Sequence, residues 1–391
     1  MEQAGKRHRQ LFVVATEPTP YKTDLFNALA ELPGWRTMVL YAQSKDWAKD
    51  AGHDFRLMPQ RAYDAAFSEG KGFRGQLASA WRLTRLVRRL RPNLVLVSGY
   101  NGIPYVTAMI VAMLAGIPFA FWVDQFNVGP PRRGSWPARI VRDAMRRIVF
   151  AQAAAVLVCG RPGRESALRA GCPEAKLVDF PYVVDIARIR GLAQASLGLA
   201  GWAPPAEPRG LILFSGRLIP RKGFDVLLEA LVLLRGTQAF SLVVEGDGPM
   251  RPRYEERVAA LGLQDRVSFV GFRQMDEHAS LLGAADIVVV PSTEDPWGLV
   301  VHEGMLMGKP VCASDAVGAA VDRIESGSNG FLFPSGDAHA LAQLLRRLLE
   351  DPGLRGRIGE AARVSAETWT PQRNAQVLLS SVLGPLEAAG R

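Results

Sequence analysis

The segment from residue 287 to residue 305 reads IVVVPSTEDPWGLVVHEGM and predicts a buried strand, a polar loop and the start of a helix. Four consecutive β-branched residues indicate a strand that is covered on both faces and ends at Pro291. The loop contains Glu294 and Asp295, and the helix is expected to begin near Gly298. A strand followed by a helix is the repeating unit of a parallel sheet, so this segment predicts an α/β fold.

The same segment places two carboxylates eight residues apart, Asp295 in the loop and Glu303 inside the helix. Both could reach a polyhydroxyl ligand, because carboxylates accept strong hydrogen bonds from hydroxyl groups. The backbone N–H groups of Gly298 and Leu299 would face an anion at the N-terminus of the helix. The structural alternative is that Asp295 caps the helix and Glu303 forms a salt bridge.

Short apolar runs recur along the whole chain and alternate with helical stretches. This alternation predicts two parallel sheets that are covered by helices on both faces. We therefore expect an α/β protein with two doubly wound Rossmann-like domains that face each other across a cleft and bind ligands in loops beyond the carboxyl ends of strands. The predicted strands are Leu11–Ala15, Thr37–Tyr41, Leu94–Val97, Phe119–Val123, Val156–Val158, Leu211–Ser215, Ser241–Glu245, Val267–Val270, Ile287–Pro291, Pro310–Ser314 and Gly330–Phe333.

Residues 191–209 are rich in Ala, Gly and Pro and form the predicted linker. An N-terminal domain over residues 1–190 and a C-terminal domain over 210–370 agree with a length of 391 residues. The composition, 48% hydrophobic and 22% charged, excludes a disordered or fibrous chain. The three cysteines are scattered, which excludes a disulfide scaffold or zinc ribbon and suits a reducing cytosol.

Two features bear on membranes. The N-terminus lacks the apolar stretch of a secretory signal. The 19 residues of Tyr105–Val123 carry no charge, but Gly116 and Pro118 interrupt them, so we expect a buried helix and a core strand rather than a membrane span.

Positive charge is concentrated in the N-terminal half. Residues 1–190 contain 28 Lys and Arg against 15 Asp and Glu, a net charge of +13, whereas residues 191–391 carry −4. The densest cluster is a predicted helix with a basic face and a possible apolar stripe. It could be an ordinary solvated helix, touch anionic lipid headgroups or, least favoured, bind nucleic acid. The arginines are Arg82, Arg85, Arg88, Arg89 and Arg91, and the apolar residues are Leu77, Trp81, Leu86, Val87 and Leu90.

Two more loops in the C-terminal half follow predicted strands. The first, SGRLIPRKG at residues 215–223, places Arg217 and Lys222 before a helix, which indicates an anion site suited to a diphosphate. A solvated basic loop is the alternative. The second, EGDGP at residues 245–249, has glycines that permit a tight turn or a close backbone approach to a ligand.

Together these motifs resemble the donor domain of the retaining GT-B glycosyltransferases of glycosyltransferase family 4. The resemblance covers residues 205–370 and includes GRLIPRKG, EGDGP, VSFVGF, ADIVVVPS, MGKPV and GSNGFLF in the family's order. It implies that Arg217 and Lys222 bind the nucleotide diphosphate, in a loop that begins at Gly216, and that Glu303 binds ribose hydroxyls. It also implies that Asp295, with Glu294 beside it, touches the donor sugar. The segment at Gly271 and Phe272 would bind the nucleobase.

The N-terminal half resembles the family's acceptor domain less closely. The usual Gly-rich loop is replaced by EPTPYK, whose Tyr21 and Lys22 would lie on the acceptor or phosphate side. Asp124 stands where many members have a catalytic His. Residues 371–391 look like the family's helix that returns to the N-terminal domain.

The motifs and the resemblance both point to an enzyme that transfers a hexose from a UDP- or GDP-sugar. The resemblance implies retention at the anomeric carbon, with Arg217, Lys222 and Asp124 as catalytic residues. No Asp-x-Asp pair is present, so we expect no metal and no further cofactor. The basic domain favours a polyprenol-diphosphate-linked saccharide acceptor, used in bacterial cell-surface polysaccharide synthesis by a cytoplasmic enzyme peripheral on the inner membrane face. The alternatives are an epimerase or phosphorylase on the same fold, and a basic nucleic-acid-binding protein.

Overall fold

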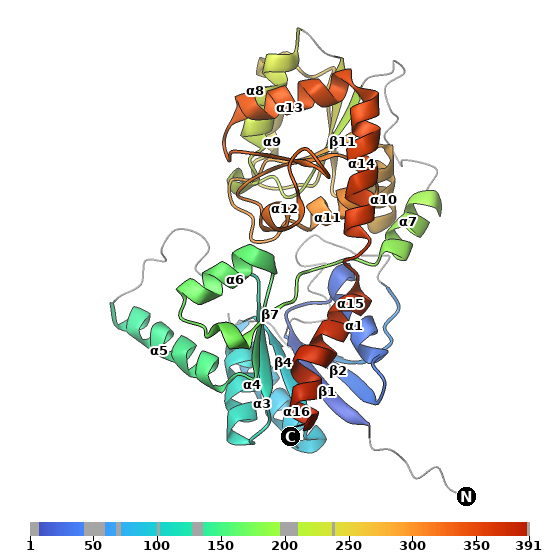
Figure 1. The fold of residues 1–391 in the computed structure, drawn as a ribbon. Helices are drawn as coiled ribbons and strands as arrows, with labels where there is room; N and C mark the ends of the chain where they lie inside the picture. Colours follow the sequence, from blue (N-terminus) through green and yellow to red (C-terminus); the bar gives the residue numbers. More distant parts are fainter. Residues whose placement is uncertain are drawn as a thin grey trace, which may run out of the picture. The chain divides into compact units, whose positions relative to one another are not determined.

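The computed structural model describes residues 8–42, 59–67, 72–99, 102–126, 136–195, 210–236 and 239–388. The chain divides into two compact units (Figure 1). Unit 1 contains the described residues up to Tyr182 together with the chain from Pro371 onwards, and unit 2 contains Val183–Thr370. The division lies before the predicted linker, whose first five residues belong to helix α7 (Ile186–Ala195), while residues 196–209 lie outside the described residues.

Unit 1 is built on a parallel seven-stranded sheet in the order β3-β2-β1-β4-β5-β6-β7. Its strands are β1 (Arg9–Ala15), β2 (Trp35–Tyr41), β3 (Asp64–Phe67), β4 (Leu94–Ser98), β5 (Phe119–Val123), β6 (Ala155–Val158) and β7 (Leu177–Asp179). Its helices are α1 (Pro20–Ala30), α3 (Gly72–Leu90), α4 (Ile103–Leu114), α5 (Trp136–Gln152), α6 (Gly160–Arg169), α15 (Pro371–Leu378) and α16 (Gly384–Ala388), with a π-helical turn at Leu379–Leu383. The short strands β3 and β7 were not predicted.

Both faces of this sheet are buried, which explains its unbroken apolar runs. In β1, Leu11, Val13 and Ala15 pack into one core, while Phe12 and Val14 pack into the core on the other face. The C-terminal helix α15 lies beside α1 and closes the first of these cores (Figure 1).

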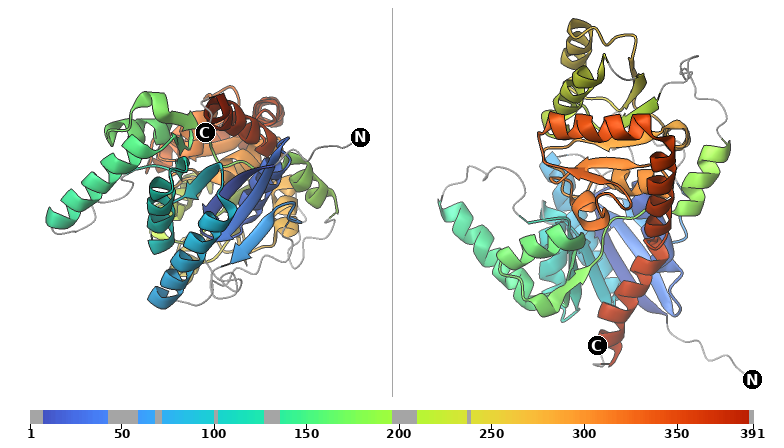
Figure 2. Two further views of the ribbon diagram at one scale, coloured as in Figure 1. Left: turned by 90° about the horizontal axis from the view of Figure 1, so that it is seen from below. Right: turned by 45° about the horizontal axis from the view of Figure 1, so that its top comes forward.

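Unit 2 has a parallel six-stranded sheet in the order β10-β9-β8-β11-β12-β13. Figure 2 shows the strands and helices of this unit from two further directions. Its strands are β8 (Gly210–Ser215), β9 (Phe240–Glu245), β10 (Val267–Gly271), β11 (Ile287–Val290), β12 (Val311–Ser314) and β13 (Phe331–Phe333), all at predicted places. Besides α7, its helices are α8 (Phe224–Leu234), α9 (Arg251–Ala260), α10 (Met275–Ala284), α11 (Leu299–Leu306), α12 (Gly318–Arg323), α13 (Ala338–Glu350) and α14 (Pro352–Ala366). The strand order reverses between β8 and β11, where the loops diverge and ligands bind in such sheets.

The uncharged stretch forms α4 and β5, which confirms the predicted helix and core strand. Burial of α4 is only partial, because Leu114 at its end is 84% exposed. Within the described residues, no helix is long and apolar enough to cross a membrane.

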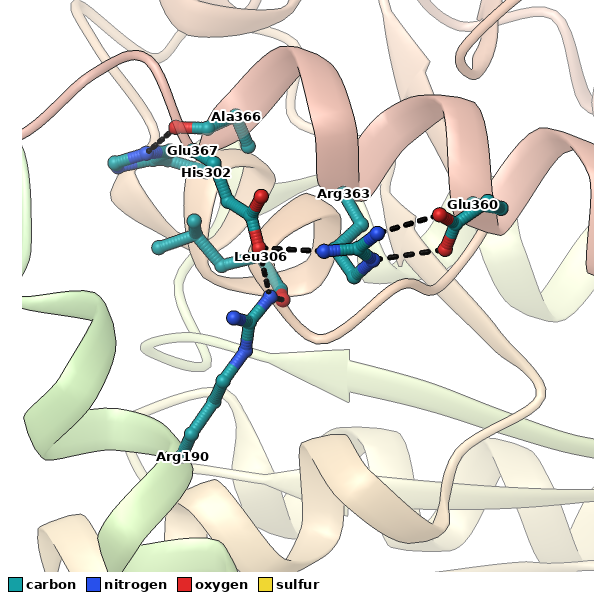
Figure 3. A network of polar contacts seen from close by, with 7 residues as sticks. All are labelled: Arg190, His302, Leu306, Glu360, Arg363, Ala366 and Glu367. Carbon is teal, nitrogen blue, oxygen red and sulfur yellow. Dashed lines mark hydrogen bonds and ion pairs between the residues drawn. The ribbon is translucent and has the colours of Figure 1, made fainter.

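Helix α7 is tied to α14 by a charged network (Figure 3). The guanidinium of Arg190 donates to Oε1 of Glu367 at 2.8 Å and to the carbonyl of Leu306 at 3.1 Å. Arg363 donates to the same Glu367 oxygen at 2.6 Å and pairs with Glu360. The network lies within unit 2, close to both points where the chain passes to unit 1.

Candidate active site

The loops that follow β8 and β11 are braced against each other. Gly223 has a φ of +67°, and a Cβ at this position would lie 1.9 Å from the carbonyl oxygen of Pro291. The backbone N–H of Thr293 donates to the carbonyl of Arg221 at 2.8 Å, and the Arg221 guanidinium donates to the carbonyl of Glu294 at 3.0 Å. Glycine at 223 therefore brings the two predicted motifs side by side.

Lys222 and Asp295 form an ion pair across this junction. The Lys222 ammonium lies 2.5 Å from Oδ2 of Asp295, whose side chain is 9% exposed, while the lysine side chain keeps 20% exposure. The family resemblance implied that Lys222 binds the diphosphate and that Asp295 touches the sugar. In the structure these two side chains contact each other. The alternative that Asp295 caps α11 is wrong. The N-cap residue of α11 is Gly298, and no side chain forms a capping hydrogen bond there.

Gly298 starts α11 directly beside Asp295. Its φ is +83°, and an added Cβ would lie 2.6 Å from Cγ1 of Val317 and 3.3 Å from Oδ2 of Asp295. Gly298 and Leu299 are both half-buried. The N-terminus of α11, with its partial positive charge, thus begins next to the Lys222–Asp295 pair.

Glu303 is one of three buried ionisable groups from three elements. Nδ1 of His278 in α10 lies 2.7 Å from Oε2 of Glu245 at the end of β9, and Nε2 lies 3.4 Å from Oε2 of Glu303 in α11. The structural alternative of a salt bridge at Glu303 is therefore confirmed. The sequence analysis missed His278 and the role of Glu245. Glu245 was the available signal: it is a second glutamate at the end of a buried strand, and two buried carboxylates require a cation nearby.

The charges within this cluster shift the pKa values of its members. Burial lowers the pKa of His278, but the negative charges of Glu245 and Glu303 outweigh burial and raise that pKa well above its ordinary value. Burial raises the pKa of Glu303, yet His278 reverses this and holds it below its usual range, with smaller contributions from His302 and Arg188. Both shifts in pKa favour a protonated imidazole between two ionised carboxylates.

The glycines of the EGDGP loop allow contact with another loop. A Cβ on Gly246 would lie 2.1 Å from the carbonyl of Gly216, and one on Gly248 would lie 2.4 Å from the carbonyl of Leu218. The N–H of Gly216 donates to the carbonyl of Glu245 at 3.0 Å. Of the two predicted reasons for these glycines, the structure supports a close turn between loops.

Arg217 belongs to the loop after β8, and Gly271 contacts the EGDGP loop. Arg217 is exposed, and among the described residues no ion pair holds its guanidinium. The carbonyl of Gly271 accepts from the N–H of Gly246 at 2.9 Å, at a register shift that bends the end of β10. Phe272, which follows, is half-buried. The predicted donor residues therefore come from the ends of strands in the unit 2 sheet, from the loops that follow them and from the helix α11.

In unit 1, Asp124 and Tyr21 are brought together by a residue that the sequence did not indicate, Tyr182. The rings of Tyr21 and Tyr182 meet edge to face, with centroids 5.1 Å apart. Burial raises the pKa of Tyr182 well above its ordinary value, and the charge of Asp124 raises it further. Asp124 also lies 4.0 Å from Sγ of Cys159 at the end of the next strand.

Lys22 does not present a free cation. It is 4% exposed, and its ammonium donates to Oγ1 of Thr16 at 2.6 Å and to Oε1 of Glu17 at 2.8 Å. Burial lowers its pKa, but Tyr21 and Glu17 outweigh burial and raise it. The charge of Lys22 is thus balanced inside unit 1, and its place on the acceptor or phosphate side stays a prediction.

Comparison with known proteins identifies the family to which both halves of the chain are similar. The family model described as glycosyl transferase 4-like domain matches residues 16–183, and the one described as glycosyl transferases group 1 matches residues 203–365. Lipopolysaccharide core biosynthesis glycosyltransferase LpsD of Rhizobium meliloti is 27% identical over 349 residues, 88% of each chain. D-inositol 3-phosphate glycosyltransferase of Salinispora arenicola is 35% identical over 228 residues, 56% of this chain and 49% of the relative.

The solved structures show the same fold. A crystal structure of Anabaena HepE in complex with UDP has a TM-score of 0.73 and 20% identity, and covers 96% of this chain and 100% of that one. The chain spans less than half the length of the first curated relatives that it matches. It belongs to the group 1 glycosyltransferases of the family 4 type, a family of transferase enzymes, and has the GT-B fold.

Proposed function

We propose that this protein transfers a hexose from a UDP- or GDP-sugar to a saccharide acceptor, with retention at the anomeric carbon. One observation carries the proposal. The segment after β8 carries an exposed arginine (Arg217) and a half-buried lysine (Lys222), and helix α11, which follows the neighbouring strand β11, carries a buried carboxylate (Glu303). Cations suit a diphosphate and a carboxylate suits ribose hydroxyls. Crystal structures of HepE in complex with UDP and with UDP-glucose add support.

The difficult step is the departure of the nucleoside diphosphate. Arg217, Lys222 and the N-terminus of α11 stabilise the negative charge that grows on the leaving oxygen. Asp295 orients the Lys222 ammonium and contacts the donor sugar, with Glu294 beside it. These protein cations take the role that a divalent metal has in other transferases, so we propose that the reaction needs no metal or other cofactor.

The acceptor hydroxyl attacks the anomeric carbon from the face that the diphosphate leaves, without a covalent enzyme intermediate. The bond to the diphosphate oxygen breaks as the new glycosidic bond forms, and the hydroxyl proton passes to Asp124 or to the departing oxygen. The interaction of Asp124 with the Tyr182 side chain supports this role, because a carboxylate that is held in place can orient a hydroxyl group.

We further propose that the acceptor is a polyprenol-diphosphate-linked saccharide of bacterial cell-surface polysaccharide synthesis, used at the inner membrane face. Helix α3 of unit 1 supports this. Leu83 and Val87 are buried, whereas Phe73, Leu77 and Trp81, spaced by four residues, are 68%, 48% and 67% exposed. The apolar stripe predicted for α3 is therefore divided between two faces of the helix: one face is buried and the other is exposed.

Arginines flank this exposed apolar face. The Arg85 guanidinium stacks on Trp81, 5.6 Å from the ring centroid. A surface hollow of about 410 Å³ is lined by Trp81, Arg82, Arg85 and Arg89, among other residues of α3. Exposed aromatic and apolar side chains beside arginines suit the interface of an anionic bilayer. We name Phe73, Leu77, Trp81, Arg85 and Arg89 the α3 membrane face.

Calorimetric titration with UDP, GDP, ADP and their common sugars in the presence of EDTA tests the donor site. We expect micromolar binding of one base series, and loss of at least tenfold affinity in Lys222→Ala. Failure of every nucleotide to bind contradicts the proposal. Product analysis then separates the alternatives: an epimerase converts the donor with no acceptor present, a phosphorylase needs phosphate, and a nucleic-acid-binding protein gives a gel shift that survives moderate salt.

A further inference from the structure

Two members of the buried cluster of Glu245, His278 and Glu303 have no role in the function described so far: Glu245 and His278. Its members come from β9, α10 and α11, so it joins the strand end beneath the EGDGP loop to the helix that carries Glu303. The side chains of Glu245, His278 and Glu303 are 6%, 9% and 8% exposed. Burying two carboxylates is costly unless a cation compensates them, and a core position would be filled more simply by an apolar side chain.

His278 contacts only one of the two carboxylate oxygens of Glu303. Both described contacts of the imidazole are to Oε2 atoms, at 2.7 Å on Glu245 and 3.4 Å on Glu303. Within the described residues, no hydrogen bond occupies Oε1 of Glu303. A doubly protonated imidazole donates from both nitrogens, so it can hold the two carboxylates at once.

We propose that His278 is a positioning residue, which holds the Glu303 carboxylate ionised and turned so that Oε1 is left for a ribose hydroxyl of the donor. This inference rests on the proposed nucleotide-sugar function and adds a residue to it. Among the described residues, His302 in α11 and Arg188 in α7 also act on the Glu303 carboxylate.

An apolar side chain at position 278 has a defined consequence. Two buried carboxylates then face each other without a cation, and one of them takes up a proton at neutral pH. A protonated Glu303 is a weaker acceptor for a hydroxyl group than a carboxylate. Removing the second carboxylate as well, by Glu245→Gln, relieves this conflict and leaves Glu303 ionised.

The test measures nucleotide affinity between pH 6 and pH 8 in the wild type, His278→Leu and Glu245→Gln/His278→Leu, with the nucleotide that the wild type binds best. We expect a flat profile for the wild type, about tenfold weaker and pH-dependent binding for His278→Leu, and recovery of most of the affinity in the double variant. The matched control is His339→Leu, which changes an exposed histidine of α13. A merely structural His278 would give His278→Leu a flat profile and wild-type affinity, and that result overturns the inference.

Nitrogen chemical shifts of the His278 imidazole in the wild type provide a second measurement, which does not require a variant to fold. We expect both ring nitrogens to be protonated at pH 8, and a neutral ring at pH 7 overturns the inference. Absence of any nucleotide binding by the wild type overturns the proposed function and this inference together. Binding by the wild type, with loss in Lys222→Ala but not in His278→Leu, overturns the inference alone.

Discussion

Arg190 and Glu367 lie 2.8 Å apart and join the two ends of unit 2 (Figure 3). Arg190 follows shortly after Val183, where the chain enters this unit, and Glu367 precedes Thr370, where it leaves. The ion pair thus ties the segment that enters unit 2 to the segment that leaves it.

Loss of this pair should lower the stability of unit 2 modestly. Arg190→Ala removes two hydrogen bonds of a half-buried guanidinium, so we expect the free energy of unfolding to fall by about 1 kcal/mol. Denaturant titration measures the change. Arg357→Ala, at an exposed arginine of α14, is the control and should have no effect. Equal stabilities of the two variants would contradict the role of the pair.

Asp295→Asn should reduce catalysis without unfolding the protein. The amide cannot hold the Lys222 ammonium at the diphosphate as the carboxylate does, so we expect kcat to fall by about 100-fold. Steady-state kinetics with the donor identified by titration measure this effect. The control is Asp265→Asn, which removes the same charge at an exposed position. An unchanged kcat in Asp295→Asn would remove Asp295 from the site.

Gly223→Ala tests whether the two loops must touch. The added Cβ would lie 1.9 Å from the Pro291 carbonyl oxygen and demand a left-handed conformation. We expect a loss of about 3 kcal/mol or more in the free energy of unfolding, together with loss of nucleotide binding. Gly236→Ala is the matched control, because no described atom lies within 4 Å of its added Cβ. Thermal unfolding of both variants distinguishes them.

His302 should make the protein less stable in acid. Burial lowers its pKa to about 4, below the ordinary value, so the unfolded chain takes up a proton that the folded chain refuses. Its contribution is complete above pH ~6.5 and is lost as pH falls toward 4. We expect unfolding at pH 5 to cost about 2 kcal/mol less than at pH 7 through this residue. Denaturation of His302→Leu at both pH values should show a correspondingly weaker dependence, and an unchanged dependence contradicts the assignment.

The α3 membrane face should govern binding to vesicles that contain phosphatidylglycerol. We expect Leu77→Ser/Trp81→Ser and Arg85→Glu/Arg89→Glu each to weaken co-sedimentation about tenfold, and salt to weaken the wild type. Val364→Ser, at a 54% exposed apolar residue of α14, is the control for apolar loss. Wild-type binding by both double variants would show that this face is not the docking surface.

The strands of both units could be predicted because parallel strands buried on two faces are continuous apolar runs. β3 and β7 escaped prediction for the same reason: Asp64–Phe67 contains two alanines and one large apolar residue, and Leu177–Asp179 has only three residues. The apolar stripe of α3 was only partly correct, since helical spacing cannot show which of two apolar faces meets the sheet.

The donor residues could be predicted, whereas their pairings could not. Lys222 and Asp295 are 73 residues apart and meet because β8 and β11 are neighbours in the sheet, an order that sequence alone does not contain. His278 lies in a helix that has no motif, and only its place between Glu245 and Glu303 reveals its charge. The pairing of Lys22 with Glu17 could not be predicted either, because the sequence does not show that Lys22 is buried at the start of α1.

The helix that returns to unit 1 has a consequence for how the chain is made. Ala375, Leu378 and Leu383 are buried against the α1 side of the N-terminal sheet. Unit 2, by contrast, needs no residue beyond Thr370. During synthesis the second unit can therefore reach its full core before the first, which must wait with one apolar face uncovered until residues 371–383 leave the ribosome. The unit that is translated first is the one that is completed last.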